Sequence, residues 1–358
     1  METRSRSWPD PLVTANLYCA GESDRAIVRV LGPLQRQPGD SSRSLWFMRS
    51  RRRGEHLKIR LHCSEREAPR LEAQLLERSA SFFAELDAEQ RSSQRDPARK
   101  SGGAAIDEED EIEGLAEDRS LLFTTYRRSP VALGGPPFTD RDRFLHLFTR
   151  ALGAGCSWQL RDGSSSQASP PAGRSLLFFR MTLLGLSALG LEPSLRPEML
   201  LYLRDWQVRA PLLQRGAPQH QADRWLERTR QGLEPQAALA DAISALALAY
   251  PAGGLPQDLE AVEREWWSAL RNLAEDVEAF RESPDFRVDP FAEDMLFAPV
   301  IKVFTGAAYQ LGMGTLEVAR CAQLMLQSLY PQHAGRPIPL RLSERTPAGP
   351  GTARAARS

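Results

Sequence analysis

The sequence predicts an α+β protein, with a mixed β-sheet in the N-terminal half and a largely helical C-terminal half packed against it. Three observations lead to this prediction. Residues 44–63 alternate apolar with basic side chains, as a β-hairpin does. Residues 163–173 form a linker rich in Ser, Pro and Gly. Beyond that linker, apolar residues recur at helical spacing almost without interruption.

The N-terminal half alternates predicted strands with predicted helices. Besides the hairpin, the predicted strands are residues 13–19, 121–127 and 156–161. The predicted helices are residues 24–34, 65–90 and 140–153. Residues 92–120 are polar and contain a run of acidic side chains, so we expect a solvated loop. A reversible cover over the basic hairpin is the alternative, and only charge complementarity supports it.

The C-terminal half is predicted to be helical throughout. Its predicted helices are residues 175–191, 197–210, 219–231, 236–250, 259–281, 291–311 and 315–330. Trp266 and Trp267 are expected to be packing residues. Residues 331–358 are rich in Pro, Arg, Ala and Ser, and we expect a disordered tail there. Residues 8–330 are expected to form a single domain.

Composition limits the classes of function. The 358 residues include 42% hydrophobic residues, which is typical of a globular chain, and the net charge is zero. A balanced charge argues against a general nucleic-acid or membrane-surface binder. The four cysteines are far apart without a C-x-x-C pair, so we expect buried thiols rather than a zinc site or disulfides.

We expect a cytoplasmic protein. The first ten residues are charged and lack the apolar core of a signal peptide. The most apolar segment, residues 176–191, is short for a bilayer span and contains Arg180. It is therefore predicted to be a buried helix.

The hairpin carries the chemical signal, because common catalytic fingerprints such as G-x-G-x-x-G and G-x-S-x-G are absent. Its cations outnumber its single acid, Glu55, which points to an anionic partner. Those cations are Arg43, Arg49, Arg51, Arg52, Arg53, Lys58 and Arg60. Strand alternation predicts one buried apolar face and one basic face. A solvated surface without a ligand is the structural alternative.

Three sequence blocks resemble the C-terminal domain of lantibiotic dehydratases. This domain also occurs as a separate chain in thiopeptide biosynthesis and is known as the thiopeptide-type bacteriocin biosynthesis domain. The first family block is an aromatic-Ile-Arg-Tyr strand followed by His-x-Arg-x-Arg. The residues on its positions are Phe47, Met48, Arg49, His56, Lys58 and Arg60. The second block is residues 126–135, YRRSPVALGG, and the third is residues 308–312, AYQLG, followed by Glu317. The resemblance covers most of residues 8–330.

Departures from the family pattern bear on the reaction. The resemblance implies elimination of glutamate from glutamylated Ser or Thr, performed by arginines, a Glu and a His. In this chain Lys58, Ser129 and Ala132 replace an Arg, the Glu and an Arg, and residues 303–308 contain no His. Arg60 alone is retained. An elimination needs a base for the Cα proton and a group that receives the leaving carboxylate.

Related thiopeptide enzymes join two dehydroalanines of a modified peptide into a six-membered nitrogen ring and release the leader peptide. The resemblance therefore implies three alternatives: this aza-[4+2] cyclisation, which fits the departures best, glutamate elimination, or non-catalytic leader binding. The expected catalytic residues are Arg60, Tyr126 and Arg128. The expected substrate-binding residues are Arg49, His56, Lys58 and Arg127. No metal or cofactor is implied.

The expected partner is a precursor peptide with its leader. Elimination would add a separate glutamylating subunit, and nucleic acid would enter only through that tRNA-dependent partner. No membrane partner is expected.

Overall fold

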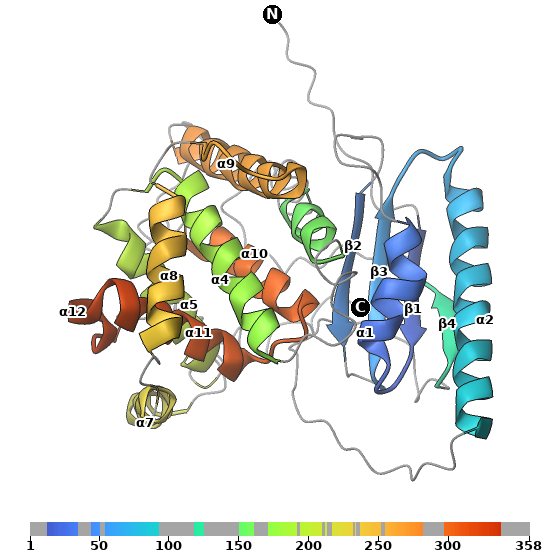
Figure 1. The fold of residues 1–358 in the computed structure, drawn as a ribbon, viewed down its shortest axis with the longest axis horizontal. Helices are drawn as coiled ribbons and strands as arrows, with labels where there is room; N and C mark the ends of the chain where they lie inside the picture. Colours follow the sequence, from blue (N-terminus) through green and yellow to red (C-terminus); the bar gives the residue numbers. More distant parts are fainter. Residues whose placement is uncertain are drawn as a thin grey trace, which may run out of the picture.

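The computed structural model describes the following residues: 13–34, 44–50, 54–92, 118–124, 150–160, 171–191, 194–209, 212, 217–231, 233, 237–251, 255–281 and 297–337. A β-sheet with two helices lies beside a larger group of helices (Figure 1). The α+β class and the division into a sheet-containing and a helical half are therefore confirmed. No helix in these ranges is long and apolar enough to cross a lipid bilayer.

The sheet is antiparallel in every pairing of its described strands, rather than mixed. Its elements are β1 (Val13–Tyr18), α1 (Ser23–Ala26) with its continuation through residues 27–34, β2 (Ser44–Ser50), β3 (His56–His62), α2 (Ala68–Ser92) and β4 (Ser120–Phe123). The strand order is β2-β3-β1-β4. Strands β1 and β2 run in the same direction but β3 lies between them. This order is the ferredoxin-like split β-α-β arrangement.

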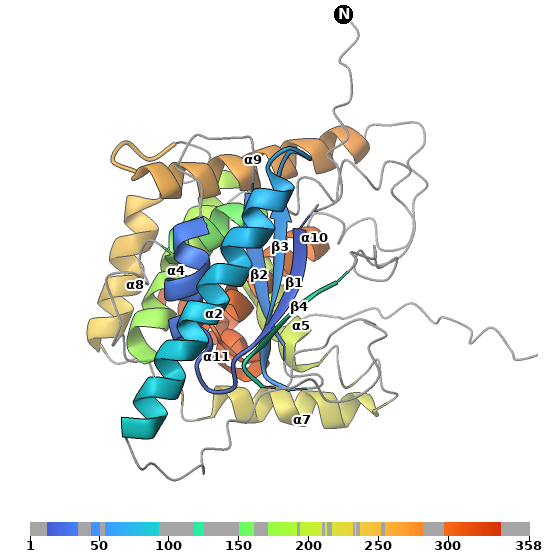
Figure 2. The same ribbon diagram turned by 90° about the vertical axis from the view of Figure 1, so that its right-hand side faces the viewer.

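One face of the sheet is covered by α1 and α2. Apolar side chains of the strands, among them Ala15, Leu17, Phe47 and Ile59, are fully buried with residues of both helices. Figure 2 shows α2 lying in front of the strands. Alternation along each strand sends these residues to the same side, and their burial stabilises the two-layer unit.

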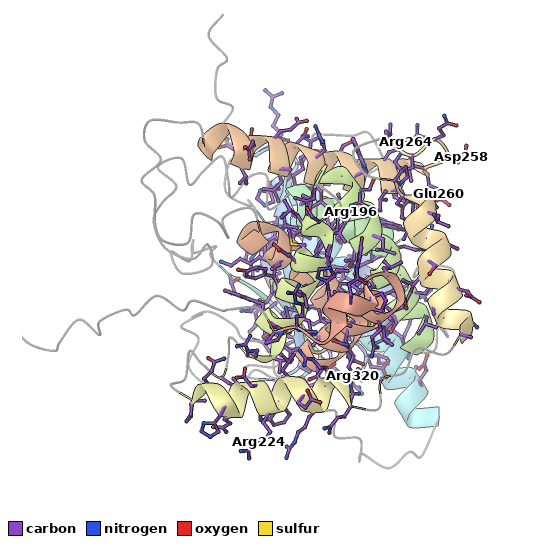
Figure 3. The ribbon with its side chains drawn as sticks, turned by 90° about the vertical axis from the view of Figure 1, so that its left-hand side faces the viewer. Arg196, Arg224, Asp258, Glu260, Arg264 and Arg320 are labelled. Carbon is purple, nitrogen blue, oxygen red and sulfur yellow. The ribbon has the colours of Figure 1, made fainter. Side chains whose placement is uncertain are left out.

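The helical half has its own core. Its elements are the helical residues 150–160, α4 (Pro171–Ala188), α5 (Leu195–Val208), α7 (Gln219–Arg230), α8 (Ala237–Ala249), α9 (Ala261–Arg281), α10 (Phe297–Gln310), α11 (Thr315–Leu329) and α12 (Pro331–Ala334). Trp266 is fully buried in this core, as expected for a packing residue, and Trp267 is partly buried against it. Exposed charged side chains such as Arg224, Arg264 and Arg320 lie on its outside (Figure 3).

The strand predicted at residues 156–161 was wrong, because residues 150–160 are helical. Apolar Cys156, Trp158 and Leu160 alternate with polar residues, which suggested a strand. All five residues 156–160 are buried, so this part of the helix is enclosed on all sides and shows no amphipathic period. The polar Gln159 is accommodated because its Nε2 donates to the Ala307 carbonyl at 2.9 Å.

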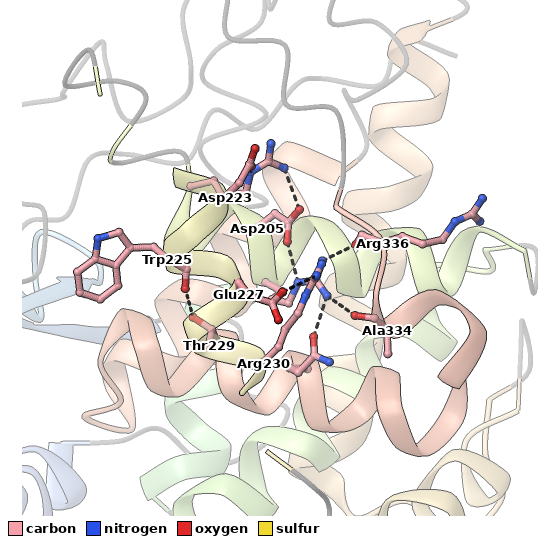
Figure 4. A network of polar contacts seen from close by, with 11 residues as sticks. Asp205, Asp223, Trp225, Glu227, Thr229, Arg230, Ala334 and Arg336 are labelled. Carbon is pink, nitrogen blue, oxygen red and sulfur yellow. Dashed lines mark hydrogen bonds and ion pairs between the residues drawn. The ribbon is translucent and has the colours of Figure 1, made fainter. Parts of the chain in front are cut away.

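The segment after α11 is also more ordered than the sequence suggested. Residues 331–334 form α12, and the fully buried Arg204 holds the chain that follows. Its guanidinium donates to the carbonyls of Ala334 and Arg336 at 2.8 and 2.6 Å and to Gln323 Oε1 at 2.7 Å (Figure 4). The buried Asp205 balances its charge at 2.7 Å. The predicted disordered tail therefore cannot begin before residue 338, and residues from 338 onward lie outside the described ranges.

Replacing Arg204 should destabilise the fold strongly. Arg204→Met would leave the Asp205 carboxylate buried with one counter-charge fewer and would orphan three acceptors, at a cost of about 3–5 kcal/mol in the free energy of unfolding. Urea denaturation measures this loss. The matched variant Arg224→Met alters an exposed arginine of α7 and should change stability by less than about 0.5 kcal/mol. Equal losses in the two variants would contradict a stabilising role for the buried contacts.

Candidate functional site

The sheet has a second face, opposite α1 and α2. Residues that pair across antiparallel strands project to the same side, so the register assigns each side chain to a face. One row across the sheet contains Met48, Lys58 and Asn16. The next contains Trp46, Arg60 and Thr14. Together with a third row, Ser50, His56 and Tyr18, these residues form what we call the polar sheet face.

The centre of the polar sheet face is buried. Arg60 is 7% exposed, Thr14 is 4% exposed and Asn16 is 2% exposed, whereas Lys58 is partly exposed. One Arg60 Nη1–H donates to the Ile59 carbonyl at 3.0 Å. A basic face that was merely solvated would leave these groups in water, because burying a charge is costly. The structural alternative, a solvated cationic surface, therefore does not describe Arg60.

Several neutral polar atoms on this face have no hydrogen-bond partner among the described residues. They are Thr14 Oγ1, Asn16 Oδ1, Trp46 Nε1 and Ser50 Oγ. Buried polar atoms are nearly always hydrogen-bonded in folded proteins, so a group of exceptions on one face calls for an explanation, such as strain, a bound water or a bound ligand. The sequence prediction missed these residues. For Thr14 and Asn16 a signal was available, because both alternate with the apolar Val13, Ala15 and Leu17 and must therefore lie on the other face of the strand.

His56 lies on the same face as Lys58 and Arg60, at the end of the hairpin. Its ring stacks on Tyr18 with the centroids 4.6 Å apart. Its Nδ1 lies 2.9 Å from the Gly54 carbonyl oxygen. These contacts hold the imidazole at the turn, and the predicted substrate-binding role of His56 stays a prediction.

Arg49 is not on the polar sheet face, which corrects the prediction of one continuous basic surface. It pairs with Leu57, whose side chain is buried with α2, so the two share the helix-covered side. Arg49 Nε donates to the Gln310 carbonyl at 3.0 Å. Arg49 also pairs with Asp24, which Arg174 of α4 binds at 2.6 Å. Arg49 thus connects the sheet unit to the helical half.

This clasp, defined as Asp24, Arg49, Arg174 and the backbone of residues 310–312, joins the first and third sequence blocks. Gly312 has a φ of +77°, and a Cβ there would lie 3.1 Å from Arg49 Cζ. Glu317, the acidic residue after the third block, accepts from the Gly314 N–H at 2.6 Å. Glu317 therefore caps the start of α11.

The second block lies outside the described residues. The structure therefore does not describe Tyr126, Arg127 and Arg128, nor Ser129 and Ala132. Their roles remain predictions.

The cysteines are buried and free, as the sequence predicted. Burial raises the pKa of Cys19 and of Cys321 to about 12 and also raises that of Cys156. These three thiols are therefore protonated at neutral pH and are poor nucleophiles. Within the described ranges, no group of three His, Cys, Asp or Glu side chains could hold a metal ion.

The fold resembles that of a known enzyme. No family model matches the chain, and no curated protein matches it. The structure is similar to pyridine synthase, TbtD, from thiomuracin biosynthesis, with 18% identity, a TM-score of 0.54 and coverage of 89% of this chain and 99% of that chain. The tRNA-dependent lantibiotic dehydratase MibB from Microbispora sp. 107891 matches with 13% identity, a TM-score of 0.44 and coverage of 90% and 28%. The first likeness confirms the fold that the sequence resemblance implied.

A side chain at position 312 should loosen the clasp. Gly312→Ala adds a Cβ at a positive φ and 3.1–3.2 Å from the Arg49 and Arg174 guanidiniums, so we expect a loss of about 2 kcal/mol or more in unfolding free energy. Gly21→Ala is the matched control, because Gly21 has a φ of +75° and nothing within 4 Å of its added Cβ. It should cost about 1 kcal/mol, from backbone strain alone. If Gly312→Ala and Gly21→Ala lowered the denaturation midpoint by the same amount, the clasp would not contribute to stability.

The clasp should also weaken in acid. Burial raises the pKa of Asp24, but the guanidiniums of Arg49 and Arg174 outweigh it and hold the pKa below its usual value. The clasp therefore stabilises the fold above about pH 4 and loses this contribution as pH falls through the lowered pKa. Asp24→Asn should be less stable than the wild type at pH 7 by up to about 1 kcal/mol, since Asp24 is 58% exposed.

Urea denaturation at a series of pH values measures this difference, which should shrink as the pH falls below about 4 and the Asp24 carboxylate becomes protonated. Asp258→Asn changes an exposed carboxylate away from the clasp and serves as the control. A stability difference between Asp24→Asn and the wild type that persists unchanged in acid would contradict the charge interaction.

Proposed function

We propose that this chain matures a ribosomally made peptide after its Ser or Thr residues have been dehydrated, and that the step is an aza-[4+2] cyclisation of two dehydroalanines. The observation that carries the proposal is the polar sheet face, where buried Arg60 and neighbouring Lys58 lie among neutral hydrogen-bonding groups. The fold likeness to a protein described as a pyridine synthase, over 99% of that chain, supports it.

Cyclisation requires a folded peptide more than it requires an acid and a base. One new carbon–carbon bond joins the Cβ atoms of the two dehydroalanines, and a second joins the Cα of one dehydroalanine to the carbonyl carbon of the residue before the other, which reacts as its imidic acid tautomer. The nitrogen of that amide completes the six-membered ring. The ring becomes aromatic as the former carbonyl oxygen leaves as water and the leader peptide leaves as a carboxamide. Holding the two reacting groups together can lower the barrier by roughly 7–11 kcal/mol at best. Arg60 is always charged, so its proposed role is to hold a carbonyl oxygen rather than to transfer a proton. Tyr126, Arg127 and Arg128 are proposed for polar contacts or proton transfer.

Glutamate elimination is the second candidate, favoured by the two cations Lys58 and Arg60 that could receive a departing carboxylate. It would require a separate glutamylating, tRNA-dependent partner. The substitutions at positions 129 and 132 and the lack of a His in residues 303–308 count against it. A leader-binding subunit without turnover is the third candidate.

Mass spectrometry of a precursor peptide coexpressed with and without this chain separates the three. Cyclisation predicts that a dehydrated precursor loses its leader and water. Elimination predicts that glutamyl adducts accumulate when the chain is omitted. A binding subunit predicts leader affinity without any change in mass. A wild-type chain that leaves the dehydrated precursor unchanged would overturn the proposed cyclisation.

Arg60→Ala should lower kcat/KM for the dehydrated precursor by about 10²-fold, because one preorganised donor to a developing negative charge is lost. Arg60→Lys keeps the charge but not the planar donor geometry and should recover only part of the rate. Arg224→Ala, on the outside of α7, is the control and should leave the rate unchanged. Circular dichroism confirms folding of each variant. Unchanged turnover in folded Arg60→Ala would remove Arg60 from the site.

A further inference from the structure

The polar sheet face contains more than cations. Asn16 lies directly across from Lys58, and Thr14 lies directly across from Arg60, whose other neighbour is Trp46. Cross-strand neighbours have their Cβ atoms about 4.5–5.5 Å apart. The neutral and cationic groups therefore occupy one small area of the sheet.

The neutral groups can form hydrogen bonds, but no described residue provides a partner for them. Asn16 is 2% exposed and Thr14 is 4% exposed, yet Asn16 Oδ1 and Thr14 Oγ1 have no hydrogen-bond partner there. Trp46 Nε1 is a buried donor that also has no hydrogen-bond partner among the described residues. The helix-covered face of the same strands is apolar apart from Arg49, which the clasp engages. The unsatisfied groups thus share one side of the sheet, beside the cations.

The combination of hydrogen-bond donors and acceptors on this face indicates which kind of ligand fits it. A carboxylate or phosphate would be attracted by the positive charges of Lys58 and Arg60, but it offers no hydrogen to Asn16 Oδ1, which is an acceptor. A secondary amide offers both kinds of group, since its N–H can donate to Asn16 and its carbonyl can accept from Trp46 Nε1 or Arg60. Asn16 and Thr14 are two residues apart, about 6.6 Å along the strand, which is also the repeat of alternate residues in an extended peptide.

We propose that Asn16, Thr14 and Trp46 bind backbone amides of the substrate peptide, with Asn16 Oδ1 accepting a peptide N–H. This inference rests on the proposed function and identifies what the site recognises: an extended peptide backbone beside the reacting residues, rather than a free anion. Asn16 is a positioning residue. It lets the chain distinguish a peptide from the small carboxylates that Lys58 and Arg60 would also attract.

Isosteric substitutions separate binding from folding. Asn16→Leu and Thr14→Val remove groups that make no hydrogen bond in the free protein, so the melting temperature should stay the same or rise. Thr182→Val is the matched control, because Thr182 Oγ1 on α4 is equally buried and equally unpartnered within the described ranges but lies outside the polar sheet face. All three variants should fold. Only the two sheet variants should bind peptide more weakly.

The binding probe is N-acetyl-dehydroalanyl-alanine methylamide. Two ester analogues each replace one N–H by oxygen: one has lactate in place of alanine, and the other is the methyl ester. The readout is the indole N–H resonance of Trp46, assigned by comparison with Trp46→Phe. In the wild type, at least one ester should bind about tenfold more weakly than the amide. In Asn16→Leu, amide and ester should bind alike, and the KM of the dehydrated precursor should rise with little change in kcat.

An amide-to-ester difference that persists in Asn16→Leu would overturn the inference, and so would acetate competing as well as the peptide. Conversion of the dehydrated precursor by Asn16→Leu at an unchanged KM would overturn it while leaving the proposed function in place. Asn16-dependent amide binding by a wild-type chain that converts no precursor would support the amide site and refute the cyclisation.

Discussion

The antiparallel register between β1 and β3 is the constraint on which the arrangement depends. Leu57, Ile59 and Leu61 pack under α1 and α2, and a shift of one residue would push Lys58 and Arg60 into that apolar layer. An ammonium or guanidinium buried there without a partner would be unfavourable by several kcal/mol. The hydrophobic face therefore fixes the register, and the register in turn places the cations beside Asn16 and Thr14.

Contacts on several elements join the sheet unit to the helical half. Arg49 leaves the sheet on its helix-covered side and donates to the end of α10. The helix of residues 150–160 lies close to β2, since a Cβ on Gly153 would clash with Ser44 Oγ. Gln159 of the same helix bonds to α10. The contact of Arg49 with α10 thus supports the polar sheet face from the other side of the sheet.

Periodicity in the sequence was sufficient to predict the strands of the hairpin, β1 and the helices from α4 to α11, because their apolar residues recur at the spacing of a strand or of a helix. It failed for residues 156–161, where burial on every side removes the helical period. It placed Arg49 with Lys58 because the face of a residue on β2 depends on the pairing with β3, which the loop between them sets. Arg60 and Lys58 were identified from a motif. Asn16 and Thr14 were missed because an unsatisfied hydrogen bond is a property of the folded surroundings, not of the local sequence.

The hold of Arg204 on the segment after α11 has an evolutionary consequence. The guanidinium contacts the carbonyl oxygens of residues 334 and 336, and every amino acid supplies a carbonyl oxygen. Mutations at those two positions can therefore accumulate without breaking the contact, whereas Arg204 and Asp205 have no such freedom. Related chains could share this anchor while their aligned letters at 334 and 336 differ completely, so the anchor would be visible by superposing structures and invisible in a sequence alignment.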